Sequence, residues 1–138
     1  MIRTRLLRVT LATLMALSFS GLTALVTVAA DDASYDMNCS SGRICIYKDG
    51  NLSGSLAATC GTCIDSDYTN DDYPNDAGNL NDTMSSGINY RSSGKVLWYP
   101  NVNYSGTPFC LDHQVAALYV GSSFNDRASS HLYAAGSC

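Results

Sequence analysis

The chain has 138 residues, with eight Lys and Arg against twelve acidic residues and a formal net charge of −4. Every acidic residue is Asp, and three of the cations (Arg3, Arg5 and Arg8) lie within the first ten residues, so the rest of the chain carries a net charge of −7. This balance argues against nucleic acid and anionic membranes as partners, because both are bound by basic surfaces. A surplus of short carboxylates suits solubility or a hard cation.

Residues 1–30 have the pattern of a secretory signal peptide. Three early arginines precede an apolar run over Val9–Val28, and the small residues Ala29 and Ala30 follow it. The run approaches the ~20 residues of a bilayer span, so an uncleaved anchor is the alternative. The Ser, Thr and Gly content of the run and the small residues at its end favour cleavage by a signal peptidase. We therefore expect an exported, soluble mature chain of residues 31–138 that forms one domain with no membrane contact.

All six cysteines lie in the expected mature chain, at positions 39, 45, 60, 63, 110 and 138. An even number in a small exported protein predicts up to three disulfides, for which 15 pairings exist. Zinc is the alternative, with Cys60, Cys63, Cys110 and His113 as its ligands, but export favours oxidised sulfur. Cys60 and Cys63 have the spacing of a redox motif without its strand-to-helix context, so we interpret them as structural.

The mature chain contains one unit twice. Residues 43–54 (RICIYKDGNLSG) match residues 95–106 (KVLWYPNVNYSG) position by position, and the hexapeptide NDTMSS at 81–86 matches NDRASS at 125–130. The distance from Tyr47 to Asn81 is 34 positions, whereas that from Tyr99 to Asn125 is 26. We expect the eight extra residues of the first unit in the acidic stretch Asp65–Asn79, as a surface loop.

Short segments rich in β-branched and aromatic residues, bounded by turn residues, predict strands and no long helix. An apolar strand start also follows each hexapeptide, at Ile88 and Leu132. Two similar antiparallel units predict an all-β sandwich. The segments are Arg43–Lys48, Lys95–Tyr99, Pro108–Asp112, Ala117–Val120 and Leu132–Ala134.

These residues resemble the βγ-crystallin superfamily. Its Greek-key signature is an aromatic residue, four residues, a second aromatic, one residue and Gly. Tyr99, Tyr104 and Gly106 match it fully, whereas the first unit has Leu52 in place of the second aromatic. The resemblance implies an all-β, disulfide-stapled sandwich of two Greek-key motifs, over residues 39–92 and 93–138.

The two hexapeptides resemble the calcium motif of that superfamily, which is two Asn or Asp residues, two free positions, Ser or Thr, and then Ser. The resemblance implies that Asp82 and Asp126 supply carboxylates, that Ser85 and Ser129 supply hydroxyls, and that Thr83 and Arg127 supply backbone carbonyls. The resemblance also implies that one turn supplies these groups of each site, and that a carbonyl from the other repeat's first hairpin, around Asp49 or Asn101, completes it. These oxygens suit calcium. The alternative is that the hexapeptides are only turns whose side chains cap backbone groups.

The start of the mature chain is similar to the actinobacterial metalloproteinase inhibitors, which share this fold. Cys39-Ser-Ser-Gly-Arg-Ile-Cys45-Ile-Tyr47 fits their opening Cys-x-x-Gly-x-aliphatic-Cys-x-Tyr pattern. The resemblance implies a Cys39–Cys45 bridge and an extracellular protease as the partner. Inhibitors of this kind present a rigid loop. The candidates here are the turn around Cys60–Cys63 and the stretch Asp65–Asn79.

Three functions follow from these resemblances, none of them enzymatic. The first is a secreted, monomeric, calcium-binding metalloprotease inhibitor. The second is an extracellular structural or stress protein that calcium stabilises. The third is an antimicrobial factor of the killer-toxin type. The fold cannot choose among them, because function depends on loops that vary freely on one scaffold.

Overall fold

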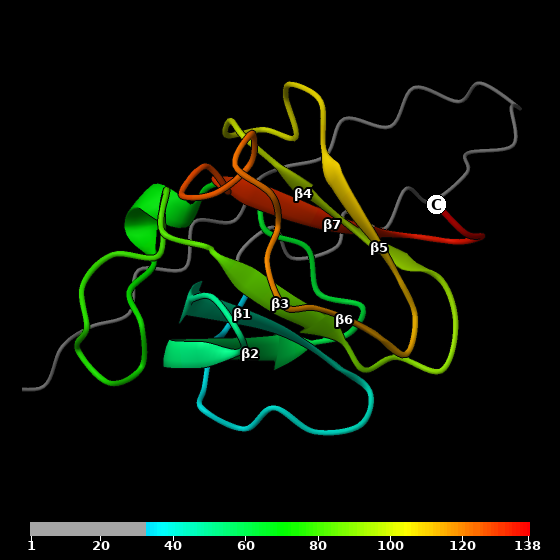
Figure 1. The fold of residues 1–138 in the computed structure, drawn as a ribbon, viewed down its shortest axis with the longest axis horizontal. Helices are drawn as coiled ribbons and strands as arrows, with labels where there is room; N and C mark the ends of the chain where they lie inside the picture. Colours follow the sequence, from blue (N-terminus) through cyan, green and yellow to red (C-terminus); the bar gives the residue numbers. More distant parts are fainter. Residues whose placement is uncertain (1–32) are drawn as a thin grey trace, which may run out of the picture.

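The computed structural model describes residues 33–138, so the predicted signal peptide and its cleavage site lie outside the described residues. Two antiparallel sheets face each other (Figure 1). No helix in the described part of the chain is long and apolar enough to cross a membrane. The elements are β1 (Arg43–Asp49), β2 (Ser53–Cys60), the 3₁₀ helix η1 (Tyr68–Asn70), β3 (Ser86–Asn89), β4 (Lys95–Tyr99), β5 (Phe109–Asp112), β6 (Val115–Ala117) and β7 (Ser130–Ala134).

Each sheet contains chain from both units. The strand order is β2-β1-β3-β6 in one sheet and β5-β4-β7 in the other, so β6 of the second unit joins the sheet of the first. In the reverse direction, Asp65 of the first unit forms an isolated bridge with His131 in β7. This exchange interlocks the two Greek keys, and it confirms the predicted all-β sandwich.

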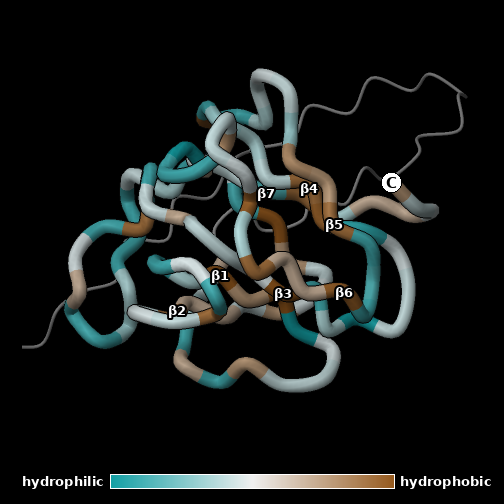
Figure 2. Tube along the Cα trace, viewed as in Figure 1, coloured by the Kyte–Doolittle hydropathy of each residue, from teal (hydrophilic) through white to brown (hydrophobic). Residues whose placement is uncertain are grey.

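The core lies between the sheets, where alternate residues of the strands point inward. Ile44 and Ile46 of β1 and Val96 and Trp98 of β4 are each at most 1% exposed. The hydrophobic residues along these strands and β3 are brown in Figure 2, against a hydrophilic rim of loops. β4 alternates between buried and half-buried residues, whereas β1 is buried at three consecutive positions, 44–46.

The Tyr-to-Gly signature encodes a tightly folded hairpin tip in each unit. Gly54 and Gly106 have φ of +76° and +90°, a region that glycine enters without a steric penalty. A Cβ on Gly106 would lie 2.7 Å from the Pro100 ring, so a larger residue would displace the hairpin. Backbone conformation and close packing therefore both require glycine at the end of the signature.

The strand predictions were wrong at three places. β2 was missed, because Ser53–Cys60 consists mainly of small residues that carry little strand signal. β6 ends at Ala117, whereas the prediction placed a strand over residues 117–120; Leu118 instead leaves the ladder, and its carbonyl accepts from Asn51 N at 2.7 Å. β7 begins at Ser130, so the last hexapeptide residue is already paired.

All six cysteines are oxidised. The pairs are Cys39–Cys45, Cys60–Cys63 and Cys110–Cys138, and no free cysteine remains in the described chain. The implied Cys39–Cys45 bridge is confirmed. The zinc alternative is wrong, because its three sulfur ligands are consumed in disulfides.

Candidate functional site

The two hexapeptides are equivalent turns that contact each other. Their second residues, Asp82 and Asp126, have φ of +55° and +57°, a left-handed conformation that Asp and Asn tolerate better than other side chains. The amide of Asp82 donates to Ala128 O at 3.0 Å, and the amide of Asp126 donates to Met84 O at 3.0 Å. Because these bonds are reciprocal, each turn fixes the other.

The pairing brings the carboxylate of one hexapeptide to the serine of the other. Ser129 Oγ lies 3.1 Å from Asp82 Oδ1 and 3.3 Å from the carbonyl oxygen of Pro100. We call these three oxygens the first half-site. In the second half-site, Ser85 Oγ lies 3.5 Å from Asp126 Oδ1. The resemblance implied that one turn supplies both groups, whereas in the structure the acid and the hydroxyl of one turn lie in different half-sites.

The first hexapeptide residue orients the carboxylate that follows it. Asn81 Nδ2 donates to Asp82 Oδ2 at 2.9 Å, and Asn125 Nδ2 donates to Asp126 Oδ2 at 2.6 Å. Each carboxylate therefore keeps its Oδ1 turned toward the serine. Asn81 Oδ1 is buried without a hydrogen-bond partner, so this oxygen is available to a cation or a water molecule at the half-site. Sequence reasoning gave Asn81 and Asn125 no role, although both belong to the motif.

The remaining predicted ligands have other partners. The carbonyls of Asp49 and Asn101 accept from Ser86 Oγ and Ser130 Oγ at 2.6 and 2.7 Å, so the sixth serine of each motif fixes a hairpin tip. Pro100 O, one residue earlier, is the carbonyl beside Ser129. Sequence reasoning missed it. The sequence signal that could have identified Pro100 is its position in the hairpin, directly before the predicted residue Asn101.

The third residues of the two motifs differ. Thr83 Oγ1 donates to Leu80 O at 2.7 Å and contacts Tyr73 Oη at 2.9 Å. Arg127 has an exposed side chain, whose Nη1 donates to Ser123 O at 3.2 Å. Neither side chain hydrogen-bonds to a half-site serine, so only the backbone carbonyls of Thr83 and Arg127 could fill the predicted role.

The donor set fits a hard cation. Carboxylate, hydroxyl and carbonyl oxygens are the ligands that calcium takes, at six to eight per ion. Among residues 33–138, no three His, Cys, Asp or Glu side chains form a group that could bind a metal, and each half-site has one carboxylate. Calcium would therefore take neutral protein oxygens and water for most of its coordination, which corresponds to modest affinity.

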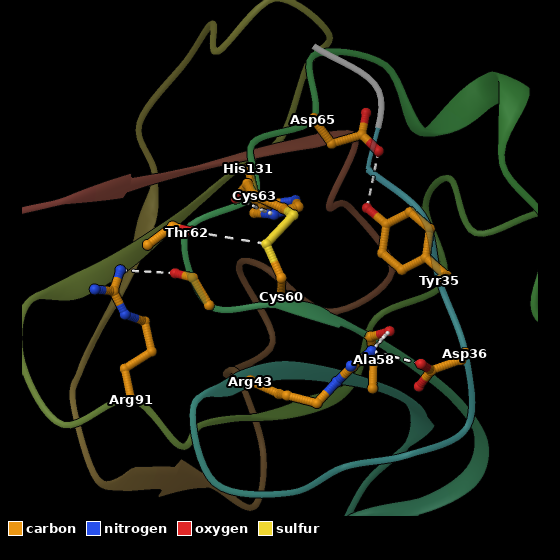
Figure 3. The surroundings of a disulfide bond; sticks show 11 residues. Tyr35, Asp36, Arg43, Ala58, Cys60, Thr62, Cys63, Asp65, Arg91 and His131 are labelled. Carbon is orange, nitrogen blue, oxygen red and sulfur yellow. Dashed lines mark hydrogen bonds and ion pairs between the residues drawn. A yellow bond between two sulfur atoms is a disulfide. The ribbon is translucent and has the colours of Figure 1, made fainter. Parts of the chain in front are cut away.

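The Cys60–Cys63 turn is a second candidate region (Figure 3). Cys63 N donates to Cys60 O at 3.1 Å, and Arg91 Nη1 donates to Gly61 O at 2.7 Å. Arg91 is itself fixed over the Tyr133 ring, 3.3 Å from its centroid. Thr62 is exposed at the tip, whereas Gly61 is buried. The turn is therefore rigid, and at its tip it presents the exposed side chain of Thr62, whose Oγ1 lies 3.7 Å from Cys60 Sγ.

The stretch Asp65–Asn79 is the surface loop that its composition predicted, with only the short helix η1 in it, but three buried residues anchor it to the core. Asp65, Tyr68 and Tyr73 are at most 1% exposed. Asp65 accepts from Tyr35 Oη at 2.9 Å, as Figure 3 shows, and pairs through its backbone with His131. The stretch replaces a fourth strand beside β7, and its aromatic residues are buried in the core. Most of its other residues remain exposed, so the stretch is a surface loop that its buried tyrosines hold against the core.

His131 lies at the centre of this buried region. Its Nε2 lies 3.1 Å from Cys63 O, which can only accept, so Nε2 carries the proton. Nδ1 then accepts from Tyr68 Oη at 2.7 Å. Burial lowers the pKa of His131 to about 4, although the Asp65 carboxylate opposes this shift. The ring is therefore neutral at physiological pH.

This pKa predicts acid sensitivity. In the unfolded chain the histidine has a pKa of ~6.5, whereas in the folded chain the pKa of His131 is about 4. Between these two pH values the unfolded chain therefore binds one proton more than the folded chain. The free energy of unfolding should fall by about 3 kcal/mol as the pH drops through this window. Urea unfolding between pH 4 and 8 measures the effect. His131→Gln should flatten the curve, and equal slopes in both proteins would contradict the prediction.

The fold and the paired turns define a βγ-crystallin domain, and solved structures agree. A domain solved in work on the evolution of the eye lens βγ-crystallin domain fold has a TM-score of 0.56 at 20% identity, over 75% of this chain and 96% of that one. A βγ-crystallin domain from Clostridium beijerinckii has a TM-score of 0.51 at 25% identity, over 65% of this chain and 94% of that one. A βγ-crystallin from Ciona intestinalis has a TM-score of 0.52 at 22% identity, over 67% of this chain and 100% of that one.

Within that fold the chain belongs to peptidase inhibitor family I36, whose model matches residues 32–111. The predicted similarity to the metalloproteinase inhibitors is therefore confirmed. No curated protein matches the chain. Membership of an inhibitor family also implies a protease as the partner, and the protein is not an enzyme.

Proposed function

We propose that the protein is a secreted inhibitor of an extracellular metalloprotease, with mature residues 31–138 stabilised by calcium at the two half-sites. The family match carries the inhibitory part and favours it over the structural and antimicrobial alternatives. Three disulfides in a small domain fit an oxidising extracellular compartment. The crossed oxygen donors support the calcium part.

The contact with the protease is proposed at the Cys60–Cys63 turn. A binding loop that is rigid before association loses little conformational entropy on binding. The disulfide, the Arg91 bond to Gly61 O and the packing of Arg91 on Tyr133 restrict this turn on three sides. The other candidate, Asp65–Asn79, is an exposed loop without a disulfide, so it is held less tightly.

Inhibition assays test this function. The oxidised mature protein should inhibit metallo-endopeptidases and leave serine, cysteine and aspartic endopeptidases active. Thr62→Arg, at the exposed tip, should raise the inhibition constant at least about fivefold, because a central contact contributes more than about 1 kcal/mol. Ser122→Arg, at an exposed position outside the turn, is the control.

Two results would contradict the proposal in different ways. Inhibition that Thr62→Arg leaves unchanged would move the contact away from the turn. A mature protein that inhibits no metallo-endopeptidase would reject the function itself.

A further inference from the structure

A cavity of about 490 Å³ opens beside the second hexapeptide. Its base is apolar: Phe109, Phe124 and Val120 line it, and the Phe109 and Phe124 rings lie 5.6 Å apart. Thr107 and Arg127 are exposed at its margin. The cavity is separate from the Cys60–Cys63 turn.

The first unit shows what occupies the equivalent position there. Aligning Tyr47 with Tyr99 makes Lys48 equivalent to Pro100 and Ser55 equivalent to Thr107; aligning the hexapeptides makes Thr83 equivalent to Arg127. Pro100, Thr107 and Arg127 all line the cavity. Their counterparts in the first unit are therefore the residues to inspect.

All three counterparts bind one segment of this chain, residues 73–77. Tyr73 Oη contacts Thr83 Oγ1 at 2.9 Å, Asn75 Nδ2 donates to Ser55 Oγ at 3.3 Å, and Lys48 Nζ donates to Ala77 O at 3.2 Å. Tyr73 is 1% exposed, so its ring is fully inserted. This segment belongs to the longer first unit, and the shorter second unit has no equivalent of it.

We propose that the cavity is a peptide-binding site for a segment of another protein, in which an aromatic side chain takes the place that Tyr73 takes in the first unit. The base supports this occupant, because Phe109 and Phe124 stand where the first unit has Ala57 and Leu80 and give aromatic partners for a ring.

The positive charge of Arg127 at the margin of the cavity favours an acidic residue in the bound segment. In the first unit Thr83 contacts a neutral phenol, whereas in the second unit Arg127 places a guanidinium at the same position. A guanidinium forms its best hydrogen bonds with carboxylates. The bound segment therefore carries an acidic residue within a few positions of the aromatic one. This inference goes beyond the proposed inhibition and does not depend on it.

The test is a titration of the ¹⁵N-labelled, oxidised mature protein with a blocked pentapeptide of sequence YPNDA, which copies residues 73–77. Saturable shift changes are expected at the amides of Thr107, Phe109, Val120 and Phe124. A peptide with Ala in place of Tyr should bind at least about tenfold more weakly, because it lacks the inserted ring. Shift changes confined to other parts of the protein, or none that saturate, would overturn the proposal.

Variants of the protein distinguish the cavity from nonspecific binding. Ser123→Trp should fill the cavity from its margin and abolish binding, whereas Ser122→Trp, one residue outside it, should bind normally. Arg127→Ala should weaken the binding of YPNDA about two- to fivefold, which is the effect of losing an exposed ion pair. It should not weaken the binding of a peptide with Asn in place of Asp. Equal binding to Ser123→Trp and the unmodified protein would also overturn the proposal.

Discussion

Calcium at a hundred times its dissociation constant should raise the free energy of unfolding by about 2.7 kcal/mol for each filled half-site, and by about 5 kcal/mol for both. The reason is that an ion which binds only the folded chain adds its binding free energy to folding. Calorimetric titration should give two ions per chain, and thermal unfolding with calcium or with a chelator should report the stabilisation. No saturable binding would mean that the hexapeptides are only turns.

Double variants test the crossed arrangement of the half-sites. Asp82 and Ser129 share one half-site, at 3.1 Å, so Asp82→Ala/Ser129→Ala should still bind one ion. Asp82→Ala/Ser85→Ala damages both half-sites and should bind none. The opposite result would mean that each turn supplies its own ligands. Asp76→Asn removes an exposed carboxylate elsewhere and is the matched control.

Removing the Cys110–Cys138 disulfide should cost about 3.5 kcal/mol of stability, a large part of the total for a small domain. The sequence separation is 28, so the closed loop contains β6, the second hexapeptide and β7, and it strongly restricts the unfolded chain. Urea unfolding of Cys110→Ser/Cys138→Ser measures the loss.

The Cys60–Cys63 pair is the comparison. With a separation of 3, its removal should cost only about 1.5 kcal/mol by the same chain-entropy argument. Equal losses for the two double variants would show that native contacts of the sulfurs, and not loop length, set the stabilisation. The protease assay would then show separately whether the Cys60–Cys63 turn needs its disulfide to inhibit.

Local features of the sequence were sufficient for the fold class and for the turns of the candidate site. The positive φ of Gly54 and Gly106, and the left-handed Asp82 and Asp126, follow from residue preferences that act within a few positions. Because the hairpin signature and the hexapeptide each occur twice in the chain, the repeat also predicted the two-unit architecture.

Tertiary structure decided which residues meet. Asp82 is three residues from Ser85 in sequence but hydrogen-bonds to Ser129, 47 positions away, because β6 and Asp65 exchange between the sheets and set the two turns against each other. Composition correctly predicted a surface loop at Asp65–Asn79, but it did not show that Tyr68 and Tyr73 anchor this loop in the core. Burying the two aromatic rings stabilises the fold, while acidic neighbours such as Asp72 and Asp76 stay exposed. The sequence alone determined the repeated local motifs; the packing between the repeats determined the half-sites and the cavity, because contacts between distant residues have no local signal.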